Sequence, residues 1–169
     1  ASAFISTLGQ AGFYFSKTEW MDSAEKAVNL IIENCVDKNF RLCRIYLNQK
    51  VSVKGQLEDY VNLIDALLCV YDLTGKYNYL QQANLLMHKC LEEFWDSQKG
   101  ILYLSPSNQV GPQLRRSLSA TDGAILSPIS TAIGCLYKLH NRSALFESEV
   151  DHKRTAEKLL GSLTGEIND

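Results

Sequence analysis

The chain has 169 residues, of which 46% are hydrophobic, so it is long and apolar enough for one globular domain with a buried core. Its 17 basic and 19 acidic residues are interspersed and give a formal charge of −2, which argues against nucleic acid and anionic membranes as partners. No apolar run in the sequence approaches the length that spans a bilayer. The first residues show neither an initiator Met nor the basic region of a secretory signal, so we expect a piece of a longer protein.

The cysteines and histidines argue against disulfide, metal and cofactor chemistry. Five cysteines are an odd, unclustered set without a Cys-x-x-Cys pair, which predicts free thiols in a reducing, cytoplasmic environment. Three scattered histidines show no metal-ligand spacing, and no Gly-rich phosphate loop is present in the sequence. We therefore expect neither a metal site nor a cofactor.

Hydrophobic periodicity predicts an all-α chain of helices that pair through short turns. Three helical hairpins are predicted, at about residues 1–36, 56–95 and 127–163. Residues 37–53 lose the helical period and predict either short strands or an extended loop, and a further short strand is predicted at 101–104. All of these elements are expected to form one domain that spans residues 1–169.

The helix predicted at about residues 56–73 is apolar on two sides. One stripe has i, i+3, i+4, i+7 spacing and contains Leu57, Tyr60, Val61, Ile64, Leu68 and Tyr71. A second stripe beside it contains Leu63, Leu67 and Val70. A helix with two apolar sides packs on both, so we expect this helix in an inner layer.

The first two hairpins repeat with a shift of 59 residues. The shift superposes Ile5 on Ile64, Leu8 on Leu67, and Trp20 on Tyr79. A repeat of hairpins predicts a layered architecture in which the first helix of each hairpin is inner and the second is outer.

A family resemblance rests on several short motifs in the expected order. Gly55-Gln56-Leu57-Glu58-Asp59-Tyr60, followed by Leu63-Ile64-Asp65-Ala66-Leu67-Leu68, resembles a signature of spermatogenesis-associated protein 20 and its bacterial YyaL-type relatives. Further matches are Phe94-Trp95-Asp96 before Gly100, Arg116 before Asp122-Gly123-Ala124, and Ser127 with Ser130 at the start of the next inner helix.

The resemblance implies a fold but no established activity. Members of that family carry a thioredoxin-like domain followed by a six-hairpin α/α toroid, similar to N-acylglucosamine 2-epimerases and six-hairpin glycosidases. The chain would correspond to about three hairpins of the toroid, with short β excursions between them. It is divergent, because the Lys-Glu pair of the family falls on Leu118 and Ser119, and its Pro, Gly and Asn fall on Leu126, Pro128 and Ile129.

Glu58 and Asp59 are the candidate catalytic residues. As a carboxylate pair at the mouth of a toroid, they could serve as acid and base on a sugar. As residues of a first helical turn, they would instead stabilise the helix N-terminus. Adjacent helical residues point about 100° apart, so at most one of them is expected to act on a substrate.

The family motifs alone indicate four candidate ligand-binding residues, namely Tyr60, Arg116, Asp122 and Ser127. The expected function is a scaffold or a ligand-binding module for a small carbohydrate-like ligand. The alternative is a carbohydrate-active enzyme, an epimerase or glycoside hydrolase, that uses Glu58 or Asp59 as acid or base. Because three hairpins cannot close a six-hairpin ring, we also expect a homodimer or contact with the rest of a longer chain.

Overall fold

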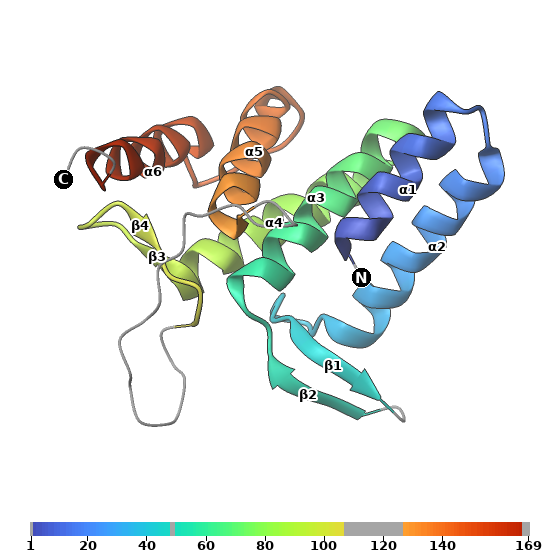
Figure 1. Ribbon diagram of the computed structural model, residues 1–169, viewed down its shortest axis with the longest axis horizontal. Helices are drawn as coiled ribbons and strands as arrows, with labels where there is room; N and C mark the ends of the chain where they lie inside the picture. Colours follow the sequence, from blue (N-terminus) through green and yellow to red (C-terminus); the bar gives the residue numbers. More distant parts are fainter. Residues whose placement is uncertain (1, 48–49, 107–126, 167–169) are drawn as a thin grey trace.

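The computed structural model describes residues 2–47, 50–106 and 127–166, and in these ranges the protein is mostly helical (Figure 1). The described ranges contain six α-helices, a 3-10 turn and two small antiparallel sheets. The helices are α1 (Ser2–Tyr14), α2 (Thr18–Cys35), α3 (Leu57–Thr74), α4 (Tyr77–Phe94), α5 (Pro128–His140) and α6 (His152–Glu166), with the 3-10 turn η1 at Ser143–Leu145. The strands are β1 (Cys43–Leu47), β2 (Lys50–Lys54), β3 (Trp95–Asp96) and β4 (Ile101–Leu102).

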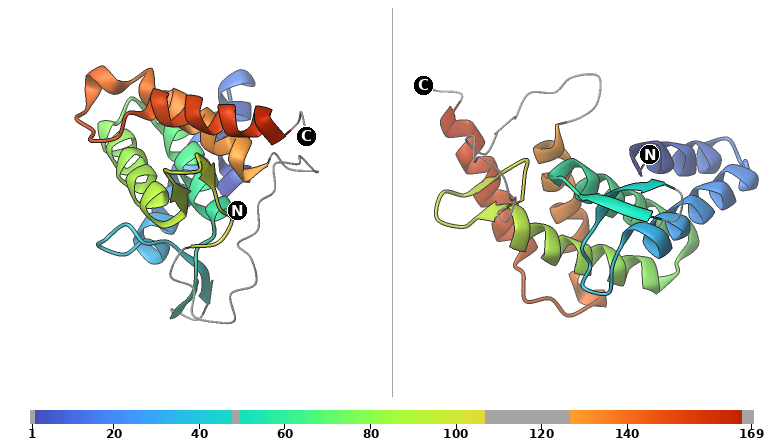
Figure 2. Two further views of the ribbon diagram at one scale, coloured as in Figure 1. Left: turned by 90° about the vertical axis from the view of Figure 1, so that its left-hand side faces the viewer. Right: turned by 90° about the horizontal axis from the view of Figure 1, so that it is seen from below.

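The helices pack in three successive pairs, and α3 also contacts helices of the other two pairs. α1 lies against α2, α3 against α4, and α5 against α6. In addition, α3 contacts α1 on one side and α5 on the other, so the first helices of the three pairs lie side by side (Figures 1 and 2). The 59-residue repeat of the sequence is also present in the second helices of the first two pairs. α2 and α4 are each 18 residues long, and α4 begins 59 positions after α2.

α3 is the most buried helix of the described part, as its two apolar stripes predict. Ten of its residues are buried, and they include Leu57, Leu63, Ile64, Leu67 and Leu68, each without exposed surface. Full burial of one such side chain contributes about 1.5–3 kcal/mol. Burial of this helix therefore holds the two flanking helices, and any site between them, in place.

Local signals set the ends of α3. The backbone N–H of Gln56 donates to Asp59 Oδ2 at 2.8 Å, which satisfies a donor at the helix N-terminus. At the other end Gly75 has φ of +68°, a left-handed conformation that glycine adopts without steric cost. The next helix begins at Tyr77, so the turn to α4 is short.

A β ribbon connects the first helix pair to the second. β1 and β2 pair antiparallel with Cys43 opposite Lys54, and the ribbon extends beyond the N-terminal end of α3 (Figure 1). Gly55 follows the ribbon where a Cβ would lie 2.9 Å from the carbonyl oxygen of Leu42, so the chain can pass this closely only at a glycine. The strands predicted within 37–53 are confirmed, whereas the strand predicted at 101–104 is limited to Ile101–Leu102.

Candidate functional site

The carboxylates of Glu58 and Asp59 share one cationic partner. Arg44 on β1 lies 3.6 Å from Glu58 Oε2 through Nη2 and 3.5 Å from Asp59 Oδ2 through Nε. The Glu58 side chain is 45% exposed and that of Asp59 is 24% exposed. Asp59 also accepts the hydrogen bond from the Gln56 backbone, so its role in the structure is to cap α3 and anchor the β ribbon.

Tyr60 is buried beneath the β ribbon. Its hydroxyl accepts a hydrogen bond of 2.9 Å from the backbone N–H of Leu42, and its ring lies edge-on to Phe94 with centroids 5.4 Å apart. Burial raises the pKa of the Tyr60 hydroxyl to about 12, although the Leu42 hydrogen bond opposes this. Tyr60 lines a cavity of about 290 Å³ together with charged residues that include Arg41 and Glu93. At neutral pH its hydroxyl is therefore a neutral group in this wall.

Ser127 is the N-cap of α5. Its Oγ accepts hydrogen bonds from the backbone N–H groups of Ile129 at 3.2 Å and Ser130 at 3.4 Å, and Pro128 follows at the first helical position. The side chain is buried at this helix end. Arg116 and Asp122, the two other predicted ligand residues, lie outside the described residues.

Within the described part of the chain, the sequence-predicted residues have separate surroundings. Asp59 lines a cavity of about 280 Å³ beside Arg44, and Tyr60 lines the separate cavity of 290 Å³. Ser127 is engaged in capping α5.

A third hollow lies between α1, α3 and α5 and has a volume of about 590 Å³. Its described walls come from the three neighbouring first helices. The lining residues are Ala3, Phe4, Ser6, Thr7, Gln10, Asn62, Asp65, Ser130, Thr131, Gly134 and Lys138. Most of these side chains carry hydrogen-bonding groups, although apolar atoms make up the larger part of the exposed lining.

Asp65 is the central charged group of this hollow. Its Oδ2 accepts a hydrogen bond of 2.6 Å from Ser6 Oγ on α1, and its Oδ1 lies 2.6 Å from Lys138 Nζ on α5. Burial lowers the pKa of Lys138, but the hydrogen bond and charge of Asp65 more than offset this and leave that pKa above its usual value. Lys138 is therefore charged at neutral pH and forms a salt bridge with the Asp65 carboxylate.

The neutral polar residues of the hollow supply both donors and acceptors. Gln10 and Asn62 each carry an amide, and Ser130 and Thr131 add hydroxyls on the first turn of α5. Concave surfaces with a few convergent polar groups are the usual form of small-molecule sites. This arrangement can hold a polar, uncharged molecule by hydrogen bonds.

The candidate catalytic and ligand-binding residues named from the sequence do not include Asp65 or Lys138. A signal for Asp65 is present in the sequence, because it is a carboxylate in the middle of a helix that is otherwise apolar at most positions. Lys138 lacks a comparable signal, since its relation to Asp65 depends on how α5 packs across α3.

Two absences hold for residues 2–47, 50–106 and 127–166. No helix in these ranges is long and apolar enough to cross a bilayer. Within the same ranges, no group of three or more His, Cys, Asp or Glu residues is placed to hold a metal ion.

Comparison with known proteins gives a distant relative. No family model matches the chain. Over 133 residues it is 30% identical to the uncharacterized protein B0495.5 of Caenorhabditis elegans. The match covers 74% of the chain and 18% of the relative, so the chain spans about a fifth of the length of the curated protein that it matches.

Proposed function

We propose that this chain is part of an α/α toroid and serves as a binding module for a small, uncharged polar ligand. The observation that carries this proposal is the hollow of about 590 Å³ between α1, α3 and α5. These are the first helices of three successive pairs, and in a toroid the first helices line the central axis. A ligand there would contact all three helices at once.

The lining of the hollow supports a carbohydrate-like ligand. Asp65 and Lys138 neutralise each other, so the hollow offers no net charge to attract an ion. The amides and hydroxyls around them match the closely spaced donors and acceptors of a sugar. Phe4 on α1 is 67% exposed and adds an apolar surface to this lining.

The same proposal includes membership in the spermatogenesis-associated protein 20 and YyaL-type family. Its support is the motif at residues 55–60, which stands at the start of the most buried helix, and the 59-residue offset between α2 and α4. On this proposal the thioredoxin-like domain of the family would lie outside the chain.

A substitution inside the hollow tests the binding function. Gly134 lines the hollow, and a Cβ built there meets no atom within 4 Å, so Gly134→Leu fills the space without displacing the core. Gly161 on α6 has equally open surroundings and does not line the hollow, so Gly161→Leu is the matched control. Isothermal titration of the native chain with glucose, N-acetylglucosamine and maltose should give a heat of binding for at least one sugar. Gly134→Leu should bind that sugar at least about tenfold more weakly, and Gly161→Leu should bind it as the native chain does. No heat from any of the three sugars would contradict a carbohydrate ligand.

A second candidate function is a carbohydrate-active enzyme that uses Glu58 or Asp59. The observation in its favour is that Asp59 lines the cavity of about 280 Å³ beside Arg44. Epimerisation or hydrolysis of the same sugars can be followed by NMR. Activity in the native chain that is lost in Glu58→Gln or Asp59→Asn would establish this function, and an inactive native chain would contradict it.

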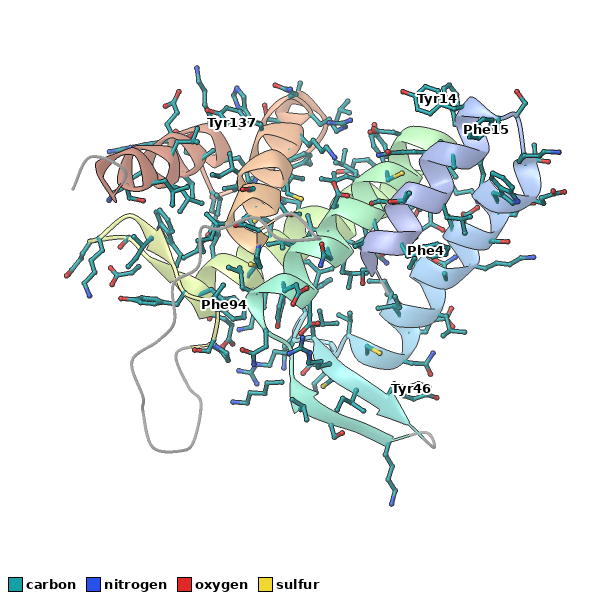
Figure 3. All side chains as sticks on the ribbon, viewed as in Figure 1. Phe4, Tyr14, Phe15, Tyr46, Phe94 and Tyr137 are labelled. Carbon is teal, nitrogen blue, oxygen red and sulfur yellow. The ribbon has the colours of Figure 1, made fainter. Side chains whose placement is uncertain are left out.

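The proposed module also associates with further protein. α1 and the turn after it expose several aromatic side chains, and three of these are consecutive: Phe13, Tyr14 and Phe15, with exposed fractions of 62%, 79% and 69%. Tyr14 and Phe15 lie at the end of α1 that is distant from α5 (Figure 3). Exposed apolar clusters favour association, so we propose contact with a second copy or with the rest of a longer chain. Light scattering after size-exclusion chromatography tests the second copy: a dimer supports it, and a strictly monomeric species contradicts it.

A further inference from the structure

Cys35 and Cys43 flank the two ends of a short loop that is closed by backbone pairing. Cys35 is the last residue of α2 and Cys43 is the first residue of β1. Between them, Val36 forms an antiparallel bridge with Leu42. The adjoining residues toward the middle of the loop are also paired, because the backbone N–H of Asp37 donates a hydrogen bond of 3.0 Å to the carbonyl oxygen of Arg41. Cys35 therefore directly precedes one residue of this bridge and Cys43 directly follows the other, so the two cysteines lie beside the closure of the same loop. A disulfide requires Cα atoms about 4.4–6.8 Å apart, a range that the chain neighbours of a bridged pair can reach.

These two thiols differ from the other three cysteines in accessibility. Cys35 and Cys43 are half-buried and line the same cavity of about 280 Å³. By contrast, Cys69, Cys90 and Cys135 are only 6%, 1% and 1% exposed. All five cysteines lie in the described ranges and carry free thiols. A solution oxidant can therefore reach this pair in preference to the rest.

We propose that Cys35 and Cys43 are a redox-active thiol pair that forms a reversible disulfide between α2 and β1. The oxidant is a small-molecule disulfide such as oxidised glutathione. The thiolate of one cysteine attacks the oxidant, forms a mixed disulfide and releases one reduced glutathione. The thiolate of the second then attacks the protein sulfur of the mixed disulfide and releases the other. In total, two S–H bonds are lost, one S–S bond forms in the protein, and the two electrons and two protons pass to glutathione.

Cys35 is suited to the second, intramolecular step. Burial raises the pKa of the Cys35 thiol, and neighbouring Cys43 raises it further, so little Cys35 thiolate is present at neutral pH. The mixed disulfide on Cys43 would lie beside Cys35, so the second attack needs no diffusional encounter. This proximity raises the rate of that step and compensates for the small fraction of Cys35 thiolate. The reaction should accordingly be faster at alkaline pH.

Peptide mapping of the oxidised chain tests the proposal. The reduced protein is incubated with oxidised glutathione, remaining thiols are blocked with iodoacetamide, and the protein is digested with trypsin without reductant. We expect an intact mass lower by two hydrogen atoms before blocking, and a disulfide that links peptides 27–38 and 42–44. Dithiothreitol should restore five free thiols. The bond should also raise the melting temperature by about 5 °C, because it constrains the unfolded chain.

Single-cysteine variants provide the controls. In Cys35→Ser, glutathione added to Cys43 has no neighbouring thiol to displace it, so a stable adduct should accumulate. Cys90→Ser removes a buried thiol and should leave the linked peptides unchanged. The proposal is overturned if the oxidised native chain retains five thiols, keeps glutathione on either cysteine, or forms only disulfides between chains.

Discussion

The carboxylate of Asp65 joins three helices that are far apart in the sequence. One oxygen accepts a hydrogen bond from Ser6 on α1, and the other lies 2.6 Å from Lys138 Nζ on α5. The Asp65 side chain is 24% exposed, so these contacts are partly shielded from water. The same group therefore both connects the helices and forms the wall of the hollow.

Replacing Asp65 by Asn should lower the free energy of unfolding by about 1–2 kcal/mol, because Lys138 loses its charged partner in a partly shielded site. Urea denaturation measures the change. The matched control is Glu157→Gln, which removes an ion pair with Lys153 at 3.9 Å in which both side chains are more than half exposed. That change should stay within about 0.5 kcal/mol. Equal effects in the two variants would show that Asp65 is only a surface charge.

Tyr60→Phe should destabilise the protein by about 1–2 kcal/mol, because the backbone N–H of Leu42 would lose its acceptor in a buried site. Amide hydrogen exchange should accelerate at Leu42 in particular. Tyr77→Phe removes a hydroxyl from a residue that is 48% exposed, and it should change the stability by less than about 0.5 kcal/mol. Unchanged protection of the Leu42 amide would refute this role for Tyr60.

Ser127→Ala should cost about 1 kcal/mol, because two backbone donors at the start of α5 lose their acceptor. Ser127→Asp retains an acceptor and should recover part of that loss. Thermal unfolding followed by circular dichroism measures both variants. Ser143→Ala, an exposed change at the start of η1, should leave the melting temperature unchanged. If Ser127→Ala also has no effect, the cap does not stabilise α5.

His152 should make the stability depend on pH. It is 3% exposed at the start of α6, and burial lowers the pKa of its imidazole to about 4. The nearby His88 and His140 lower this pKa further, and Asp151 raises it. In the unfolded chain the pKa is about 6.5, so the unfolded state binds the proton more readily. Stability should be fully present above about pH 6.5 and fall by up to about 3 kcal/mol as the pH drops to 4.

Urea unfolding at a series of pH values measures this dependence. His152→Gln removes the titrating group and should flatten the profile between pH 6.5 and 4. His140→Gln removes a neighbour and should retain most of the slope. A native profile that is already flat in this interval would contradict the expected titration of His152.

Several features of this protein follow from residues that are close together in the chain. The apolar stripes of 56–73 predict a helix buried on two sides, and α3 is the most buried helix of the described part. Ser127-Pro128 and Gly75 are local signals for a helix start and a helix end, and they stand at the start of α5 and the end of α3. Periodicity and capping depend on neighbours within about four positions, so the sequence contains all the information that they need.

The polar contacts at the candidate sites were decided by tertiary structure. Ser6 and Lys138 are 59 and 73 residues from Asp65, and no local pattern relates them. Likewise, Arg44 meets Glu58 and Asp59 only because the β ribbon turns back toward the start of α3. Sequence motifs pointed to the two carboxylates at that helix start, whereas packing of α1 and α5 on α3 formed the larger hollow around Asp65. The sequence determined which segments are helical and which sides of them are apolar, but the charged partners depend on how whole helices pack, and that is a property of the complete fold.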